Sequence, residues 1–167
     1  MLRRGAPARV PDGRRECPAR FGVAAAANFP LELVLPEGGT RHATLHGFSQ
    51  GLGLPLVLDF VATDCEACSA AARQADGVVA EFAGRCAALL VCIGAGTDAA
   101  RSFAKANAIG RCAVSAAERG AELLVEYGVE SLPHRALIAG CRVVKNRGGQ
   151  LPADLDAAVG VPDAARG

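Results

Sequence analysis

The chain has 167 residues, of which 51% are hydrophobic and 21% are charged, and its formal net charge is +1. This length and balance predict one folded domain with a core of its own and exclude a largely disordered chain. A near-neutral charge and an aromatic content of only 4%, without tryptophan, argue against a nucleic-acid partner. No apolar run is long enough to predict a transmembrane segment.

The first 28 residues differ in composition from those that follow. They contain six arginines against two acids and are rich in alanine, proline and glycine. Organelle leaders are arginine-rich and poor in acids, so residues 1–28 are expected to be either a plastid or mitochondrial targeting segment or a disordered basic arm without an address. The folded domain is expected over residues 29–160, with a C-terminal tail at 161–167.

The first half of this domain predicts two buried strands around a helix. Alternating leucines and a Pro-Glu-Gly-Gly turn after residue 29 first predict a short hairpin at the domain edge. The apolar run Leu54–Val61 is typical of a strand covered on both faces, and Asp59 is its single acid. Helical spacing of apolar residues predicts a helix over Cys65–Phe82, and a second apolar run predicts a strand over Cys86–Ile93.

The second half continues this alternation of helices and strands. Its predicted elements are a helix over Asp98–Asn107 capped by Thr97, a short strand over Cys112–Ser115, a helix over Ala121–Gly128, two strands over Arg135–Ile138 and Arg142–Lys145, and a helix over Pro152–Val159. Helical crossovers imply parallel strands, and the late hairpin adds an antiparallel pair. The predicted fold class is therefore α/β, a central mixed sheet with helices on both faces.

Cys65 and Cys68 lie three residues apart at the start of a predicted helix. The free N–H groups and the dipole of a helix N-terminus favour the thiolate, which is the reactive form of cysteine. Almost one turn further on, Cys68 can attack a mixed disulfide formed on Cys65, so the pair predicts thiol–disulfide chemistry. A zinc clip is the alternative, but it needs two more ligands, and no pattern ties His42 and His46 to the cysteines.

The chain contains seven cysteines at irregular spacing. This odd number does not resemble a secreted disulfide framework, so a soluble protein in a reducing intracellular compartment, with mostly free thiols, is expected. Cys86 and Cys92 share one face of a strand by parity and are predicted to be core residues. Cys112 and Cys141 are expected to be buried or partly exposed.

Two further residues extend the predicted site. Burial makes the charge of Asp59 costly and raises its pKa, so this carboxyl could accept and return the proton that Cys68 must lose. Otherwise Asp59 pairs with a core lysine or faces solvent at a strand end. Pro133 directly precedes a predicted strand and is either a cis-proline beside the cysteines or an ordinary trans proline.

These motifs resemble a known fold. The stretch "VLDFVATDCEAC" looks like the active-site region of the thioredoxin fold, and "YGVESLPHRALI" resembles the segment of that fold that carries the cis-proline and the next strand. The leading hairpin, an inserted strand and helix at about Ile93–Leu123 and the trailing segment are similar to the TlpA/ResA-like branch, close to the redoxins. The resemblance covers about Phe29–Val159 and implies a thioredoxin-like fold.

The resemblance also implies roles for individual residues. Cys65 would be the attacking thiolate, Cys68 the resolving thiol, and Asp59 the buried proton acceptor. Pro133 would be the cis-proline, with the backbone of Leu132 pairing to a substrate chain. The implied activity is reduction or exchange of disulfides in a protein partner, a main-chain recognition that tolerates many partner sequences. No metal and no organic cofactor beyond the cysteine pair is expected.

The sequence departs from this family pattern around the first cysteine. Asp64 stands where tryptophan is usual, and Glu66 follows Cys65 directly. Two acids disfavour the thiolate, which predicts a reducing rather than a strongly oxidising couple. After Pro133, His134 is a candidate substrate-binding residue together with Leu132 and Pro133. His134 and Arg135 are expected either to offset the local negative charge or to be solvated at the strand edge.

Two alternative functions stay open beside thiol–disulfide exchange. The first is a thioredoxin-like structural or assembly subunit of a larger complex, with little or no turnover. The second is a redoxin-type peroxidase, which needs a threonine and an arginine arranged for peroxide and a proline-rich approach to the cysteine. Thr63 alone does not supply that arrangement.

Overall fold

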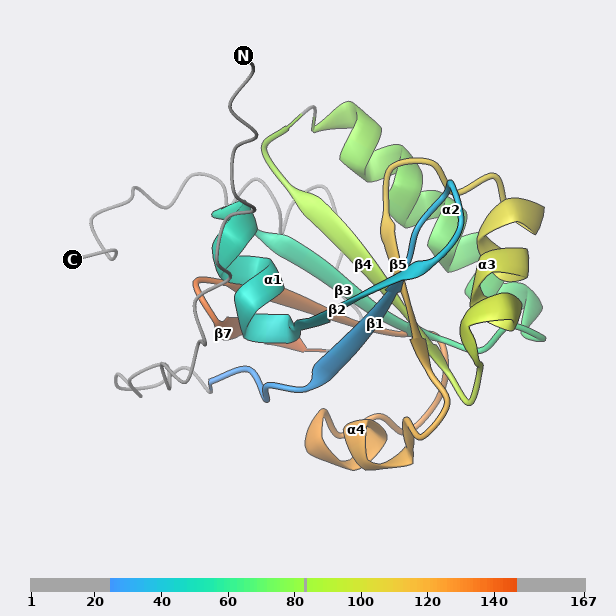
Figure 1. Ribbon diagram of the computed structural model, residues 1–167. Coiled ribbons are helices and arrows are strands. Elements are labelled where there is room, and N and C mark those ends of the chain that lie inside the picture. The colour runs from blue at the N-terminus through green and yellow to red at the C-terminus, as the bar shows by residue number, and fades with distance from the viewer. Residues whose placement is uncertain (1–24, 83, 147–167) are drawn as a thin grey trace, which may run out of the picture.

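The computed structural model describes residues 25–82 and 84–146, and Figure 1 shows how their helices and strands are arranged. The elements are β1 (Pro30–Val34), β2 (Thr40–Thr44), α1 (Leu45–Leu52), β3 (Leu56–Val61), α2 (Glu66–Glu81), β4 (Ala87–Ile93), α3 (Thr97–Ala106), β5 (Ala113–Ala117), α4 (Ala121–Glu126), β6 (His134–Ala139) and β7 (Arg142–Asn146). Most of the basic arm, the predicted helix over Pro152–Val159 and the C-terminal tail lie outside the described residues.

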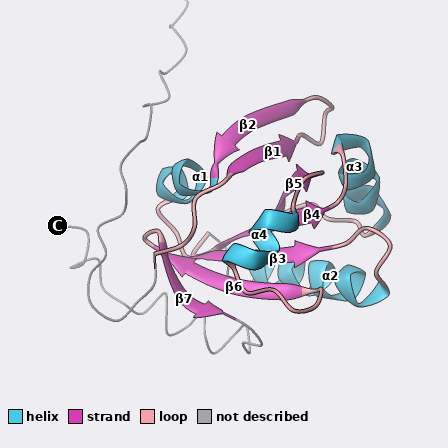
Figure 2. Cartoon of the chain, turned by 90° about the horizontal axis from the view of Figure 1, so that it is seen from below, coloured by secondary structure: helices cyan, strands magenta, loops and turns pink. Residues whose placement is uncertain are grey.

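Within the described residues, seven strands form one sheet in the order β2-β1-β5-β4-β3-β6-β7. Strands β3, β4 and β5 are parallel, whereas β6 runs antiparallel to β3, and β1 antiparallel to β5. Figure 2 shows β2 and β7 at opposite edges of the sheet. The predicted mixed sheet is confirmed, and so is the predicted hairpin of β1 and β2 at a sheet edge.

Two apolar clusters cover the two faces of the sheet. One cluster packs α2 and α3 against the sheet through side chains such as Ala75 and Phe103. The other packs Leu45 of α1 and Tyr127, directly after α4, against the opposite face. Figure 1 accordingly shows α2 and α3 together on one side of the sheet, and α1 on the other. The central strand β3 is buried along all six residues, which explains its nearly uninterrupted apolar sequence.

The structure adds one helix that the sequence pattern did not predict. Helix α1 begins after Thr44, whose side chain accepts a hydrogen bond from the Gly47 N–H and caps the helix. Its first residue, Leu45, is fully buried. The prediction that Thr97 caps α3 was wrong, because Thr97 is the first residue of that helix and Gly96 occupies the cap position without a side-chain hydrogen bond.

Asp76 on α2 fixes the loop that leads into β5. Its carboxylate Oδ1 accepts hydrogen bonds from the backbone N–H groups of Gly110, Arg111 and Cys112, at 3.2, 2.7 and 2.9 Å. Burial opposes ionisation of this carboxyl, but the three backbone donors outweigh it and lower the pKa of Asp76. The charged form of Asp76 therefore stabilises the connection between α2 and the sheet.

We expect Asp76→Ala to lower the free energy of unfolding at pH 7 by about 1–3 kcal/mol, because three backbone donors lose their acceptor. The pKa of Asp76 is lower in the folded state than in the unfolded state. Its contribution is therefore complete above the unfolded value and is lost as pH falls through the folded value. Urea unfolding at pH 7 and near pH 2 measures both effects, and the difference between variant and parent should shrink in acid.

Asp98→Ala is the matched control for this prediction. Asp98 is an almost fully exposed helix acid that pairs with Arg101. An exposed ion pair contributes little to stability, so this variant should unfold close to the parent. If Asp76→Ala unfolded at the same urea concentration as Asp98→Ala, Asp76 would not anchor the loop.

Candidate active site

Cys65 and Cys68 form a disulfide at the start of α2. Cys65 is the N-cap residue, with extended backbone angles, and its Sγ accepts a hydrogen bond from the Cys68 N–H at 3.1 Å. The Cys68 Sγ in turn lies 3.4 Å from the backbone N–H of Ala62, just beyond β3. Cys65 is half-buried, whereas Cys68 is completely buried. The two sulfurs are therefore unequal, since only Cys65 offers any surface to a partner.

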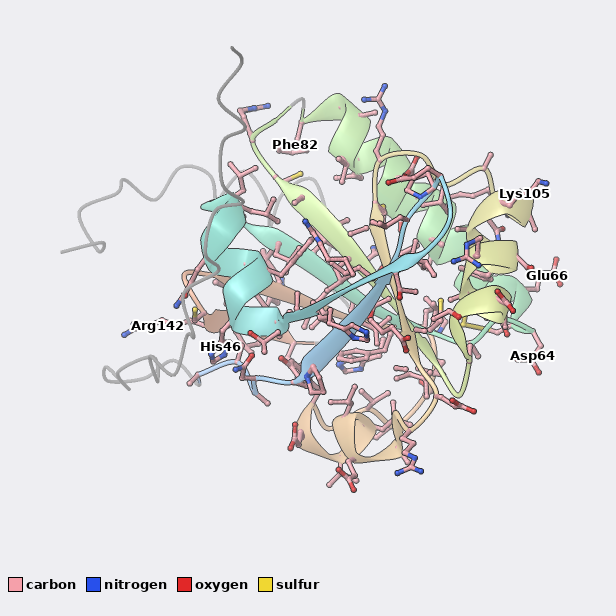
Figure 3. The ribbon with its side chains drawn as sticks, viewed as in Figure 1. His46, Asp64, Glu66, Phe82, Lys105 and Arg142 are labelled. Carbon is pink, nitrogen blue, oxygen red and sulfur yellow. A yellow bond between two sulfur atoms is a disulfide. The ribbon has the colours of Figure 1, made fainter. Side chains whose placement is uncertain are left out.

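Acidic side chains flank the partly exposed sulfur on both sides along the chain. Asp64 and Glu66 are both exposed. Figure 3 shows these two side chains pointing outward near the start of α2. Glu66 also lies in the first turn of the helix, where a negative charge is stabilised by the helix dipole. The exposed rim of the disulfide is therefore acidic.

Asp59 lies on β3 beneath α2 and is 1% exposed. Its carboxylate accepts two hydrogen bonds from Arg135 on β6, at 2.6 Å from Nε and 2.5 Å from Nη2. The two residues stand directly opposite each other in the register of β3 and β6. Both sequence-based alternatives for Asp59, a lysine partner and a solvent-facing end, were wrong. So was the expectation that Arg135 is solvated, because its side chain is only 16% exposed.

Burial and Arg135 act in opposite directions on Asp59. Burial disfavours the charged form and raises the pKa of Asp59, while the hydrogen bonds and the charge of Arg135 lower it. Burial is the larger effect, so the pKa of Asp59 lies above the ordinary value for an aspartate. The buried carboxyl thus has a higher proton affinity than a solvated aspartate.

The remaining donors of Arg135 connect the strand pair to α2. Nη2 also lies 3.3 Å from the carbonyl oxygen of Ala71, and Nη1 donates to Gln74 Oε1 at 3.1 Å. Ala71 is three residues after Cys68 on the same helix, so the guanidinium lies about one helical turn beyond the buried sulfur. Arg135 therefore joins β3, β6 and the helix that carries the disulfide.

The segment before β6 contains the predicted substrate-binding residues. The Leu132–Pro133 peptide bond is cis, and both residues are half-buried. Leu132 packs against the apolar cluster that contains Cys68 and that Cys65 also borders. The structure thus brings Leu132 and the cysteine pair to one cluster although they are more than sixty residues apart in sequence.

His134 is not brought to the disulfide by its side chain. The imidazole ring is buried and packs against Phe60 at a centroid distance of 6.1 Å. Its Nε2 is hydrogen-bonded to Asn146 Oδ1 on β7 at 2.7 Å. Phe60 belongs to the cluster on the opposite face of the sheet from α2. Because successive strand residues point to opposite faces, Arg135 rather than His134 points toward the cysteine helix.

Cys86, Cys92 and Cys112 are free thiols, whereas Cys141 is buried and its Sγ accepts a hydrogen bond from Gln50 Nε2 at 3.3 Å. Cys86 and Cys92 are buried in the same cluster, as parity predicted. Burial raises the pKa of Cys92 to about 12, so that thiol stays protonated near neutral pH. Burial and then the charge of Asp76 raise the pKa of the half-buried Cys112. Cys17 lies outside the described residues.

The histidines considered for a zinc clip are separated. His42 is exposed on β2, whereas His46 is buried on α1 with its Nε2 2.7 Å from the carbonyl oxygen of Ala26. No three histidine, cysteine or acidic side chains gather as a metal site anywhere in residues 25–82 and 84–146.

Within the residues that the structure describes, no helix has the length and apolar character needed to cross a membrane.

Comparison with solved structures gives many matches to the whole arrangement, although no protein-family model and no curated protein sequence matches the chain. The thioredoxin domain of a thiol-disulfide oxidoreductase from Bacteroides vulgatus aligns with a TM-score of 0.65 at 14% identity, covering 84% of this chain and 96% of that one. The exposed lipoprotein thioredoxin Etrx1 from Streptococcus pneumoniae aligns with a TM-score of 0.58 at 26% identity, covering 78% and 96%.

A third similar structure is MTB dsbF, solved in its mixed oxidised and reduced forms. It aligns with a TM-score of 0.59 at 24% identity and covers 78% of this chain and 94% of that one. These alignments cover nearly the full length of each matched chain, so they compare whole domains. The alignments thus agree with the thioredoxin-fold resemblance seen in the sequence. The chain has the thioredoxin fold.

Proposed function

We propose that this protein is a thiol–disulfide oxidoreductase that reduces or exchanges disulfides in protein partners through Cys65 and Cys68, as a member of the TlpA/ResA-like branch. The observation that carries the proposal is the disulfide at the start of α2, with one half-buried and one fully buried sulfur. Thiol-disulfide oxidoreductases among the similar structures add support from the fold.

The reaction needs two exchanges. In the reduced protein the Cys65 thiolate attacks a disulfide of the partner, forming a mixed disulfide and releasing one partner thiolate. Cys68 then gives its proton to Asp59, and its thiolate attacks the Cys65 sulfur, which releases the second partner thiolate. The partner disulfide gains two electrons, and the cysteine pair loses two. Asp59 passes its proton on to the released thiolate or to water, and a protein dithiol must reduce the pair before the next turnover.

Leu132 and Pro133 would receive the partner chain. Both are partly exposed, and Leu132 borders the same apolar cluster as Cys65. An extended partner segment could pair with this backbone, which gives affinity without strict dependence on partner sequence. The proposed substrate is therefore a disulfide in an extended or locally unfolded protein segment.

The redox equilibrium of the pair tests this function first. We expect the full chain, equilibrated in glutathione or dithiothreitol buffers and read by the mass shift of alkylated thiols, to show one two-electron transition. The Cys65→Ser and Cys68→Ser variants should both lack it, because each removes one sulfur of the pair.

Cys92→Ser is the matched control, since Cys92 is a buried free thiol on the neighbouring strand. It should keep the transition at an unchanged midpoint. A folded protein without a reversible Cys65–Cys68 transition would contradict the proposal and leave the structural-subunit alternative in its place.

The acidic rim predicts the direction in which the redox potential can be shifted. We expect the double variant Asp64→Asn/Glu66→Gln to have a potential higher by about 10–20 mV, because removing exposed negative charge stabilises the thiolate of the reduced form. The same equilibration in glutathione or dithiothreitol buffers measures the shift in potential, which should be larger at low salt because charges are screened less.

Glu81→Gln provides the comparison, because Glu81 is an exposed acid at the far end of the same helix. Its potential should match that of the parent. An equal or lower potential in the double variant than in the parent would show that the acidic rim does not control the couple.

A further inference from the structure

The reaction leaves one buried proton to be moved. Cys68 is completely buried, so its thiol proton cannot pass directly to bulk water. Among the described residues, Asp59 is the one buried acid, and it lies on the face of β3 that α2 covers. Whatever fixes the charge and position of Asp59 therefore also affects the second exchange.

Arg135 is the residue that fixes the charge and position of Asp59. It holds both carboxylate oxygens of Asp59 from one side of the guanidinium, a two-point arrangement that fixes position as well as charge. The same guanidinium donates to Ala71 and Gln74 on α2. The ion pair is thereby tied to the helix that carries Cys68.

We propose that Arg135 is a positioning residue of the cysteine site, which keeps Asp59 charged and in place beneath α2 and so sets the pH range in which Cys68 can give up its proton. The inference rests on the proposed function, because it assigns a step of that reaction. Arg135 acts through Asp59 and takes no part in bond exchange itself.

The direction of the effect follows from the groups around Asp59. Without Arg135 the carboxyl would keep its burial but lose its compensating charge, so its protonated form would persist to higher pH. The other titratable groups that face this region are His134 on β6, Cys92 on β4, Cys112 beside β5, and Cys68 and Asp76 on α2. Among them, His134 also favours the charged form of Asp59, but less than Arg135 does, and its ring lies on the other face of the sheet.

A single-turnover assay separates the two exchanges. Reduced full-length protein is mixed with an aromatic disulfide, 5,5′-dithiobis(2-nitrobenzoate), and the two released thionitrobenzoate equivalents are followed from pH 5 to 9. The first equivalent reports attack by Cys65, and the second reports resolution by Cys68. In parallel, carbon-13 NMR follows the titration of the Asp59 carboxyl in the same variants.

In Arg135→Met we expect the titration midpoint of Asp59 to rise by about one pH unit or more. The second release should slow by about tenfold on the acidic side of the profile and approach the parental rate at high pH. Arg135→Lys keeps the charge but loses the two-point contact. Its Asp59 midpoint and its rate of second release should therefore lie between those of the parent and of Arg135→Met. Arg101→Met is the matched control, because Arg101 is also a partly buried arginine paired with an aspartate, and it should leave both profiles unchanged.

Asp59→Asn distinguishes a positioning role from a purely structural one. In that background, adding Arg135→Met should not shift the pH profile of the second release any further. An unmoved Asp59 midpoint in Arg135→Met, or an additional shift in the double variant, would overturn the proposal.

The test also decides in two less favourable cases, a variant that does not fold and a parent protein that releases no second equivalent. If Arg135→Met does not fold, Arg135→Lys replaces it, and no change in its Asp59 midpoint would overturn the proposal. If the parent protein releases no second equivalent at all, the proposed function fails instead, while the Asp59 midpoint still shows whether Arg135 controls that carboxyl.

Discussion

The buried ion pair between Asp59 and Arg135 constrains the architecture around it. Two charges enclosed between a sheet and a helix are stable together only if they meet with good geometry, because either one alone would be a costly uncompensated charge. The pair forms only when β6 runs beside β3 in the observed register. Through Arg135 it also fixes α2, so strand pairing, helix position and the cysteine site depend on the same contact.

Most of the fold could be predicted from the sequence because its central strands are nearly uninterrupted apolar runs. Strands β3 and β4 are buried along almost their whole length, so their sequences carry a strong strand signal. Helix α1 was missed because its sequence, with two glycines, a serine and a histidine in eight residues, has a weak intrinsic helix preference. Tertiary contacts stabilise it instead, since Leu45 is fully buried and the His46 ring contacts the Ala26 carbonyl.

The candidate site was predictable to the extent that its signals are local. A pair of cysteines at a helix start and a proline before a strand can be read from short stretches of sequence. The partner of Asp59 could not, because it lies 76 residues away and is selected by strand register. Alternation along β6 does carry a usable signal, since two adjacent polar residues on a strand must point to opposite faces. Of His134 and Arg135, only one could therefore face the cysteine helix.

The acids at the rim of the site and the acid beneath it differ in their surroundings, and in the proposed reaction they therefore affect different steps. Asp64 and Glu66 are in water, where their influence on the exposed sulfur is weak and screened by salt. Asp59 is enclosed, so its charge acts at close range and requires a closely paired opposite charge, which the largely buried Arg135 supplies. In the proposed reaction, the outer acids therefore affect the stability of the Cys65 thiolate, and the inner pair affects the transfer of the Cys68 proton. Substitutions on the helix surface could thus change the redox potential without disturbing proton transfer, whereas a change at Arg135 would affect the proton first.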